Sequence, residues 1–211
     1  MADITQLGFH FDSGKCSGCK ACQIICKSKF DAEITQNNRR VYEYVGGTTI
    51  QNNDKTIKSN VFAYYVSIGC NHCSEPVCVK ACPTGACNKQ KGNGLVKIDP
   101  NICIGCGSCS RACPYDAPQL DPVRRIMTKC DGCEDEVRKG ELPRCVAGCP
   151  QRALDFGTMN ELKDKYPNAT RGDIAPLPNP SITNPSLLVT QNKHARSSGS
   201  YDGKIENKSE V

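Results

Sequence analysis

The protein has 211 residues, a formal net charge of +5 at pH 7, 17 cysteines and no tryptophan. Leu, Ile, Val and Phe together account for 40 residues, just under the share at which a sequence begins to look disordered. Because tryptophan is absent and the other aromatic residues are not interleaved with the basic ones, a nucleic-acid-binding surface has little support. No run of 18 apolar residues occurs, so we expect no segment that crosses a membrane.

The 17 cysteines predict metal binding rather than disulfide bonds. Their number is odd, the sequence is longer than the usual small disulfide-stabilised domain, and no apolar secretory signal stands at the N-terminus. We therefore expect free thiols, and an interior that is filled in part by metal instead of hydrocarbon.

The predicted elements of the first third are mostly strands. Alternating apolar residues predict a strand over 8–12, and a helix is expected over 21–30. Two further strands are expected over 40–47 and 60–68, on either side of a polar turn region at 52–54.

Shorter elements are predicted farther along the sequence. A strand is expected over 95–99, a short helix within 134–139 and a closing strand over 152–156. A capping box at 158–161 predicts a helix that runs through Tyr166.

From residue 168 onward the sequence is rich in Pro, Asn and Ser and shows little periodicity. This composition is typical of a disordered tail. Several apolar residues argue against full solvation and favour an extended arm that packs on a partner subunit. These residues are Ile174, Leu177, Ile182, Leu187, Leu188 and Val189.

Sixteen of the cysteines form four groups, and each group begins C-x2-C and ends x3-C. In sequence order the groups are Cys16, Cys19, Cys22 and Cys26; Cys70, Cys73, Cys78 and Cys82; Cys103, Cys106, Cys109 and Cys113; and Cys130, Cys133, Cys145 and Cys149. The third group matches the C-x2-C-x2-C-x3-C-P run of bacterial ferredoxins, which binds 4Fe-4S clusters. In that run three thiolates hold one cluster, and the last cysteine ligates the other cluster of a pair.

This exchange of the last cysteine must be reciprocal, so the two middle groups and the two outer groups are predicted to pair. The predicted ligands are Cys16, Cys19, Cys22 and Cys149 for cluster 1; Cys26, Cys130, Cys133 and Cys145 for cluster 2; Cys70, Cys73, Cys78 and Cys113 for cluster 3; and Cys82, Cys103, Cys106 and Cys109 for cluster 4. Four clusters would add a charge of roughly −8, which leaves about −3 overall. Nearby basic residues are interpreted either as charge compensation or as solvated surface: Lys15, Lys20, Lys27, Lys80, Arg111, Lys129, Arg144 and Arg152.

Three details leave alternatives open. The fourth group alone also suits a zinc ribbon. His72 lies between two ligands, and a histidine ligand would raise the cluster potential, but with sixteen cysteines to hand we expect a surface position or a contact beside the ligands. Cys87 belongs to no group, and we interpret it as a small buried hydrophobe rather than a redox-active thiol.

The segments between the cysteines carry a family resemblance. Residues 40–47, 60–65, 127–133 and 152–157 resemble the iron-sulfur (B) subunit of the anaerobic dimethyl sulfoxide reductase family, with the weakest similarity at 51–58 and in the last twenty or so residues. The cysteine pattern itself is shared with nitrate, formate, tetrathionate and polysulfide complexes. The sulfoxide assignment therefore depends on the segments between the cysteines.

The resemblance implies an α+β fold of two ferredoxin-like (2 × 4Fe-4S) lobes with short strands and helices around a cluster-filled core. The outer lobe would comprise residues 1–30 and 114–167, and the inner lobe residues 70–113. A β-rich insertion would occupy residues 31–69, and residues 168–211 would form an extended C-terminal tail that contacts partners.

The resemblance also implies the function: electrons pass from a quinol-oxidising membrane anchor, or an equivalent donor, to a molybdopterin catalytic subunit that reduces dimethyl sulfoxide and other S- or N-oxides in anaerobic respiration. Cluster 1 would face the molybdenum subunit and cluster 4 the membrane. Some nitrate reductase relatives have Trp and a 3Fe-4S cluster at the position of Cys106, so the cysteine here predicts a full cubane.

The protein is expected to catalyse nothing alone, because it shows no nucleophile with a paired base, no phosphate-binding loop and no dinucleotide fingerprint. The expected location is bacterial and peripheral to a membrane through the partners, on the periplasmic face after export with a twin-arginine partner, or alternatively on the cytoplasmic face. The alternatives are the same role in another molybdenum oxidoreductase, of tetrathionate, polysulfide, nitrate or formate, and a soluble polyferredoxin.

Overall fold

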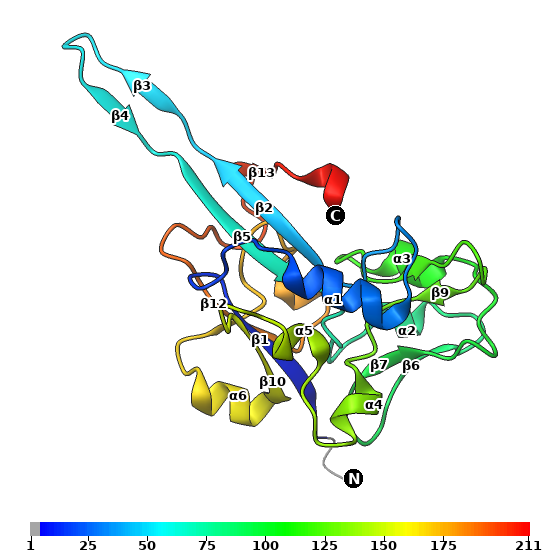
Figure 1. Ribbon diagram of the computed structural model, residues 1–211. Coiled ribbons are helices and arrows are strands. Elements are labelled where there is room, and N and C mark those ends of the chain that lie inside the picture. The colour runs from blue at the N-terminus through cyan, green and yellow to red at the C-terminus, as the bar shows by residue number, and fades with distance from the viewer. Residues whose placement is uncertain (1–4) are drawn as a thin grey trace.

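The computed structural model describes residues 5–211 and shows a mixed α/β protein organised around a four-stranded sheet of order β10-β1-β12-β11 (Figure 1). Strand β1 (Leu7–Asp12) pairs antiparallel with β10 (Leu154–Thr158) and parallel with β12 (Leu187–Thr190). Strand β11 (Thr170–Arg171) completes the sheet beside β12. The strands predicted near residues 8–12 and 152–156 are confirmed, and they are neighbours in space.

The C-terminal segment forms part of the protein's own sheets. Strand β12 lies in the core sheet, and β13 (Gly203–Ile205) pairs with β2. Five of the six apolar residues expected to pack on a partner are buried within this same molecule: Ile174, Leu177, Leu187, Leu188 and Val189. Packing on a partner is therefore the wrong explanation for these five, whereas Ile182 is exposed. Contact between other parts of this segment and a partner stays a prediction.

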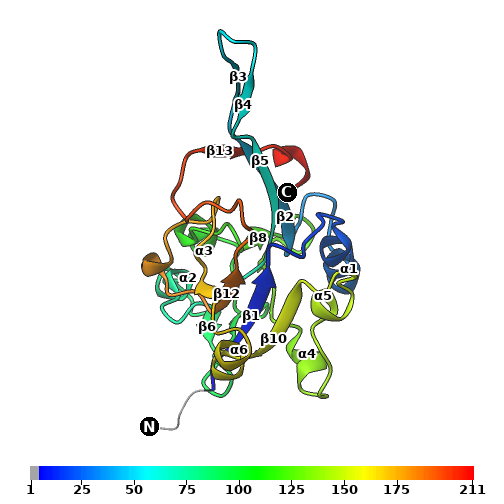
Figure 2. The ribbon, with the colours of Figure 1, turned by 90° about the vertical axis from the view of Figure 1, so that its left-hand side faces the viewer.

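A second sheet has the order β13-β2-β5 and continues into a projecting arm. The two strands predicted on either side of the polar turn are present as β2 (Arg40–Gly46) and β5 (Phe62–Ile68), and they pair antiparallel along their full length. Beyond them, β3 (Thr49–Gln51) and β4 (Ile57–Ser59) extend the hairpin away from the body (Figures 1 and 2). The polar turn is thus the tip of a long hairpin, and all six residues of its two strands are exposed.

The helices are short except for α1 (Ala21–Phe30), which matches its prediction. The predicted capping box is present at α6 (Met159–Lys165): Thr158 Oγ1 accepts a hydrogen bond from the Glu161 N–H, and Glu161 Oε2 accepts one from the Thr158 N–H. The other helices are α2 (Val77–Lys80), α3 (Ser108–Ala112), α4 (Glu134–Val137) and α5 (Arg144–Ala147), with the 3-10 helices η1 (Pro180–Ile182) and η2 (Lys208–Glu210). The remaining strands are β6 (Cys87–Lys89), β7 (Val96–Ile98), β8 (Gln119–Leu120) and β9 (Met127–Thr128).

Two of the helices that carry cysteines begin in the same way. Lys20 and Gly107, each the residue after the second cysteine of its group, have φ values of 60° and 72° and cap α1 and α3. This left-handed conformation turns the backbone sharply, so that the third cysteine of the group enters the first turn of the helix. The first and third groups therefore share a backbone conformation as well as a cysteine spacing.

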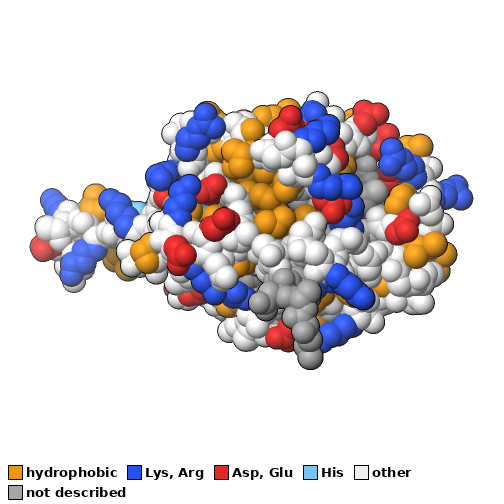
Figure 3. All heavy atoms as spheres, turned by 90° about the horizontal axis from the view of Figure 1, so that it is seen from below, with side chains coloured by type: hydrophobic (Ala, Val, Ile, Leu, Met, Phe, Trp, Pro, Cys, Tyr) orange, Lys and Arg blue, Asp and Glu red, His pale blue; other side chains and the backbone are white. Residues whose placement is uncertain are grey.

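The surface carries mixed charge. Seen from below, Lys and Arg side chains are interspersed with Asp and Glu side chains over the face shown in Figure 3. Among the helices of residues 5–211, none is long and apolar enough to span a bilayer.

Candidate iron-sulfur centres

All seventeen cysteines lie within the described residues, and all are free thiols there. Three cysteines of the first group, Cys16, Cys19 and Cys22, line a cavity that also receives Cys149, more than 120 residues later in the sequence. Helices α1 and α5 pack against each other and bring this residue across. The cavity is lined by Cys16, Cys19, Cys22 and Cys149 together with Phe11, Ser17, Lys20, Val41, Ser67, Pro150, Gln151, Ala153 and Leu154. The four cysteines predicted for cluster 1 thus share one largely apolar cavity.

A second cavity has the same construction. Helices α2 and α3 pack together and bring Cys113 to the cysteines of the second group. The lining consists of Cys70, Cys73, Cys78 and Cys113 together with Asn71, Pro76, Val96, Tyr115, Ala117, Pro118 and Lys129. The four cysteines predicted for cluster 3 thus also share one cavity.

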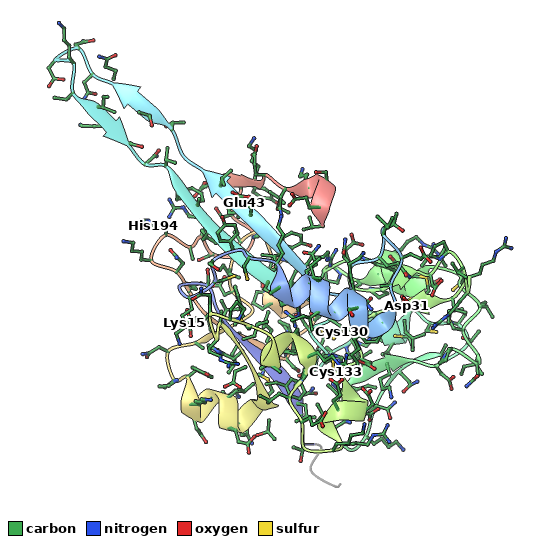
Figure 4. The ribbon with its side chains drawn as sticks, in the orientation of Figure 1. Lys15, Asp31, Glu43, Cys130, Cys133 and His194 are labelled. Carbon is green, nitrogen blue, oxygen red and sulfur yellow. The ribbon has the colours of Figure 1, made fainter. Side chains whose placement is uncertain are left out.

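The four cysteines predicted for cluster 2 are all buried. Burial raises the pKa of Cys26 to about 12, against the opposing charge of Arg39 and with smaller contributions from the neighbouring sulfurs of Cys145 and Cys133. Cys130 and Cys133 lie beneath α1 in the view of Figure 4. These cysteines, from α1, from α5 and from the segment that leads into α4, therefore gather in the interior.

The cysteines predicted for cluster 4 lie nearer the surface. Cys109 is buried, Cys82 and Cys103 are half-buried, and Cys106 is exposed. The sulfur of Cys82 lies near that of Cys106, and the sulfur of Cys103 lies near that of Cys109, because each pair interacts electrostatically. Within residues 5–211, no three His, Cys, Asp or Glu side chains are grouped so as to hold a single metal ion.

The four sets follow one another through the molecule. Cys22 of set 1 interacts electrostatically with Cys145 of set 2, and Cys130 of set 2 with Cys70 of set 3. Cys78 of set 3 packs with Cys109 of set 4. The order is therefore 1-2-3-4, and the only exposed cysteines, Cys19 and Cys106, belong to the two end sets.

Backbone N–H groups point at several sulfurs. Ala153 donates to Cys149 Sγ at 3.3 Å, and Met127 donates to Cys103 Sγ at 3.4 Å. Gly132 donates to Cys130 Sγ at 3.4 Å. Such donors stabilise a thiolate, and hydrogen bonds to sulfur are one way a protein sets a cluster potential.

Arg39 is a buried cation surrounded by cysteine sulfurs, and sequence reasoning missed it. Its Nη1 donates to Ser67 Oγ at 3.1 Å, and Ser67 Oγ lies 3.3 Å from Cys22 Sγ. Burial lowers the pKa of Arg39, but the charges of the cysteines of sets 1 and 2, led by Cys145, more than reverse this and raise it. In the described residues Arg39 forms no salt bridge with a carboxylate.

Lys129 is the corresponding buried cation between sets 2 and 3. Its Nζ lies 3.4 Å from Cys70 Sγ and donates to the carbonyl of Cys130 at 3.0 Å and to that of Val96. Although burial lowers the pKa of Lys129, nearby cysteine charges, Cys70 first, raise it overall. No carboxylate of residues 5–211 forms a salt bridge with it. Of the eight basic residues noted beside the cysteines, Lys129 is the buried one.

His72 is fully buried, so a surface position is wrong, and it contacts the cysteines instead. Its Nδ1 accepts the Val96 N–H at 2.9 Å, which leaves the ring proton on Nε2, 3.9 Å from Cys130 Sγ. Burial lowers the pKa of His72 well below its usual value, so the ring is neutral.

These features fit a polynuclear iron-sulfur cofactor. Burial raises the pKa of Cys16 and of Cys113 to about 11, so these thiols need a bound metal to become thiolates at neutral pH. A 4Fe-4S core with four thiolates carries a net negative charge, and the buried cations and the N–H donors supply the matching positive field.

Comparison with known proteins gives two family matches. Residues 61–159 match a family described as a 4Fe-4S dicluster domain, and residues 13–35 match a 4Fe-4S binding domain. The sequence is 51% identical to the B subunit of anaerobic dimethyl sulfoxide reductase from Haemophilus influenzae, over 99% of this protein and 100% of that relative.

Two relatives from Escherichia coli are also similar. The identity is 45% with the B subunit of its anaerobic dimethyl sulfoxide reductase, over 98% of this protein and 99% of the relative. It is 35% with the iron-sulfur subunit of formate dehydrogenase-O, over 93% of this protein and 70% of the relative. With full-length similarity at this level, the protein belongs to the family of anaerobic dimethyl sulfoxide reductase B subunits.

Proposed function

We propose that the protein is the electron-transfer subunit of a molybdenum oxidoreductase complex, that it holds four 4Fe-4S clusters and that it catalyses no reaction by itself. The observation that carries this proposal is the pair of cavities in which three cysteines of one group meet the last cysteine of another. A 4Fe-4S cluster needs four thiolates, and the ferredoxin run supplies them in this three-plus-one pattern. The relatives named as B subunits and as iron-sulfur subunits agree with this role.

The proposed ligand sets are the four predicted from spacing, and they use sixteen cysteines. Shared cavities support sets 1 and 3, and the electrostatic neighbours described above support sets 2 and 4. When bound, the clusters take up and release one electron each. The protein's own residues exclude water, supply N–H donors to the sulfurs and place Arg39 and Lys129 between adjacent sets.

The proposed lobes follow from the same pairing. Packing of α1 on α5 supports an outer lobe of residues 1–30 and 114–167, and packing of α2 on α3 supports an inner lobe of residues 70–113. Residues 31–69 are the β-rich insertion that carries the arm. Residues 168–211 are the tail, for which partner contact is proposed in addition to its pairing within this molecule.

The proposed electron route runs from set 4 to set 1, between the two ends where a cysteine is exposed. A quinol-oxidising membrane anchor, or an equivalent donor, would reduce the Cys106 end. A molybdopterin subunit that reduces dimethyl sulfoxide and other S- or N-oxides would accept electrons at the Cys19 end, and the higher identity to dimethyl sulfoxide reductase B subunits favours this acceptor. We place the complex on the periplasmic face, exported with a twin-arginine partner.

The same role in another molybdenum oxidoreductase is the second candidate, and the similarity to a formate dehydrogenase subunit favours it. The test uses the complex purified anaerobically through this subunit. We expect molybdenum to co-purify, and dithionite-reduced cluster signals to be reoxidised by dimethyl sulfoxide. Clusters that stay reduced with sulfoxides and N-oxides but are reoxidised by another substrate would overturn the sulfoxide assignment. Absence of molybdenum from the purified complex would overturn the proposal of a molybdopterin partner.

A further inference from the structure

The β3–β4 arm is an exposed feature to which electron transfer itself gives no role. It leaves the body as a direct extension of β2 and β5 (Figures 1 and 2). The register does not change along it, since Gly46 pairs with Phe62 in the body and Thr49 pairs with Ser59 in the arm. At a rise of about 3.3 Å per residue, residues 47–53 carry the tip about 23 Å beyond the last pair of the body.

Hydrogen bonds at both ends hold the arm as a ribbon. At its root, the Thr48 N–H donates to Asn60 Oδ1 at 2.6 Å, and the Thr48 carbonyl accepts the Asn60 N–H at 3.1 Å. At its tip, the Asn52 N–H donates to the Thr56 carbonyl at 2.8 Å. A two-stranded ribbon alone in water is only marginally stable. An element that keeps this shape fits a surface that a partner covers.

One face of the ribbon is apolar. Side chains alternate between the faces of a strand and paired residues share a face, so Val45, Ile57 and Val61 lie on one side and form an apolar stripe. Ile57 and Val61 are exposed, Val61 to 60%. A shallow hollow at the root is lined in part by Val45, Val61 and Tyr201, which is 96% exposed. The opposite face packs in the core, where Phe62 is buried.

The position of the arm indicates which partner it meets. Strand β5 also builds the set 1 end, because Ser67 lines that cavity and the Tyr65 ring lies against Gly18, next to the exposed Cys19. Helices α2 and α3, which carry ligands of sets 3 and 4, lie on the side of the body away from the arm (Figure 1). The arm is therefore continuous with the end proposed to deliver electrons, and it points away from the end proposed to receive them.

We propose that the arm and its apolar stripe dock the molybdopterin catalytic subunit, an inference that rests on the proposed function and names the surface by which that partner is held. The stripe seats against an apolar groove of the catalytic subunit, beside the surface that covers Cys19. The arm thereby holds the partner in register over set 1.

The test compares two arm variants in the complex purified anaerobically through this subunit. Ile57→Ser with Val61→Ser removes the exposed apolar part of the stripe, and a shortened protein has Asn-Gly in place of residues 47–61. Because burial of each of these side chains favours binding, we expect both variants to raise the dissociation constant of the catalytic subunit about tenfold or more. Ile34→Ser is the matched control, since Ile34 is 90% exposed and follows α1 at the end remote from Cys19.

The measurement is the molybdenum-to-iron ratio of the purified complex over a dilution series, with the anchor polypeptide and the mass of the complex determined in parallel. Both arm variants should lose molybdenum at dilutions at which the unmodified complex and the Ile34→Ser complex retain it, and they should keep their iron and the anchor.

Three results would overturn the inference. Molybdenum retained by both arm variants would show that the arm does not hold the catalytic subunit. Loss of the anchor with molybdenum retained would assign the arm to the anchor, and a halved mass with molybdenum retained would assign it to a second copy of this protein. If the shortened protein loses iron, the serine variant decides, because its two substitutions are at exposed positions.

The unmodified complex separates this inference from the proposed function. If it contains no molybdenum, the proposed partner fails before the arm is tested. If it contains molybdenum and the arm variants bind the catalytic subunit as tightly, only the docking role of the arm fails.

Discussion

Arg39 and Lys129 are buried where no carboxylate pairs with them in residues 5–211. An unpaired buried cation costs several kcal/mol, so a compensating negative charge is required. The proposed clusters provide that charge on both sides of each cation. These residues thus link the stability of the fold to the presence of the cofactor.

Arg39→Ala should lower the potentials of clusters 1 and 2, because it removes a positive charge that favours the reduced state. At the effective dielectric of protein sites, the reduced state should lose about 1–2 kcal/mol of stabilisation. Arg39→Lys keeps the positive charge, so its effect on the potentials should be smaller. Potentiometric EPR would measure this, with the exposed Arg152→Ala as control. Unchanged potentials in Arg39→Ala would contradict the role given to this cation.

We expect the fold to lose stability in acid because His10 is buried. Burial lowers its pKa to about 4, against the opposing effects of Asp12 and Asp155, while Lys15 and Lys165 add to the lowering. Since the folded pKa lies below the unfolded value near 6.5, the stabilisation is complete above pH 6.5 and is lost as the pH falls toward 4.

Between pH 6.5 and pH 4, the free energy of unfolding should fall by up to about 3 kcal/mol through the protonation of His10. His10→Gln should be less stable at pH 7, because the ring stacks on Tyr166 at 3.5 Å, but should lose less on acidification. Thermal unfolding from pH 7 to pH 5 measures the difference, and parallel pH curves for the two proteins would show that His10 does not titrate on unfolding.

At the residue scale the sequence predicts ligands but not their surroundings. The cysteine spacing is regular enough at the start and end of each group to predict four ligand sets. Arg39, by contrast, stands in the polar run Gln36–Arg40, which resembles a solvated loop. Only the pairing of Arg40 with Ile68 at the start of β2 brings Arg39 next to Ser67, and that pairing is not visible locally.

At the scale of elements, the capping box of α6 can be tested directly. Thr158→Ala removes the acceptor for the Glu161 N–H, and we expect it to cost about 1 kcal/mol. Asp164→Ala on the exposed face of the same helix is the control and should stay within about 0.5 kcal/mol. A Thr158→Ala melting temperature equal to that of the control would argue against the cap.

The β3–β4 arm should be dispensable for folding. Ile50 and Ile57 are 61% and 69% exposed, so the arm buries little of its own apolar surface. Replacing residues 47–61 by Asn-Gly would close β2 and β5 with a two-residue turn at the Gly46–Phe62 pair. We expect full iron content and little change in melting temperature. Loss of iron in the shortened protein would mean that the arm supports the core.

Local elements such as α1, β2 and β5 are predictable because their periodicity is in the sequence. The parallel pairing of β1 with β12 is not, because about 175 residues separate the strands and a Pro-rich segment precedes β12. The apolar residues near β12 are recognisable as needing burial, but the sequence does not say which surface buries them.

At the scale of the whole molecule, the four proposed clusters form a line with an exposed cysteine at each end, and buried cations lie between sets 1 and 2 and between sets 2 and 3. The net charge changes sign when the clusters are counted, from +5 for the polypeptide to about −3. The positive charge of the polypeptide is therefore more than offset by the charge that the clusters would bring.

The most direct test of this account is iron and acid-labile sulfide analysis of the anaerobically purified complex, with EPR spin quantitation after full reduction. Four clusters predict about sixteen iron and sixteen sulfide per copy of this subunit, and about four reduced spins with mutual interaction. Iron for only two clusters, or zinc in place of iron, would contradict the reciprocal ligand sets on which the account depends.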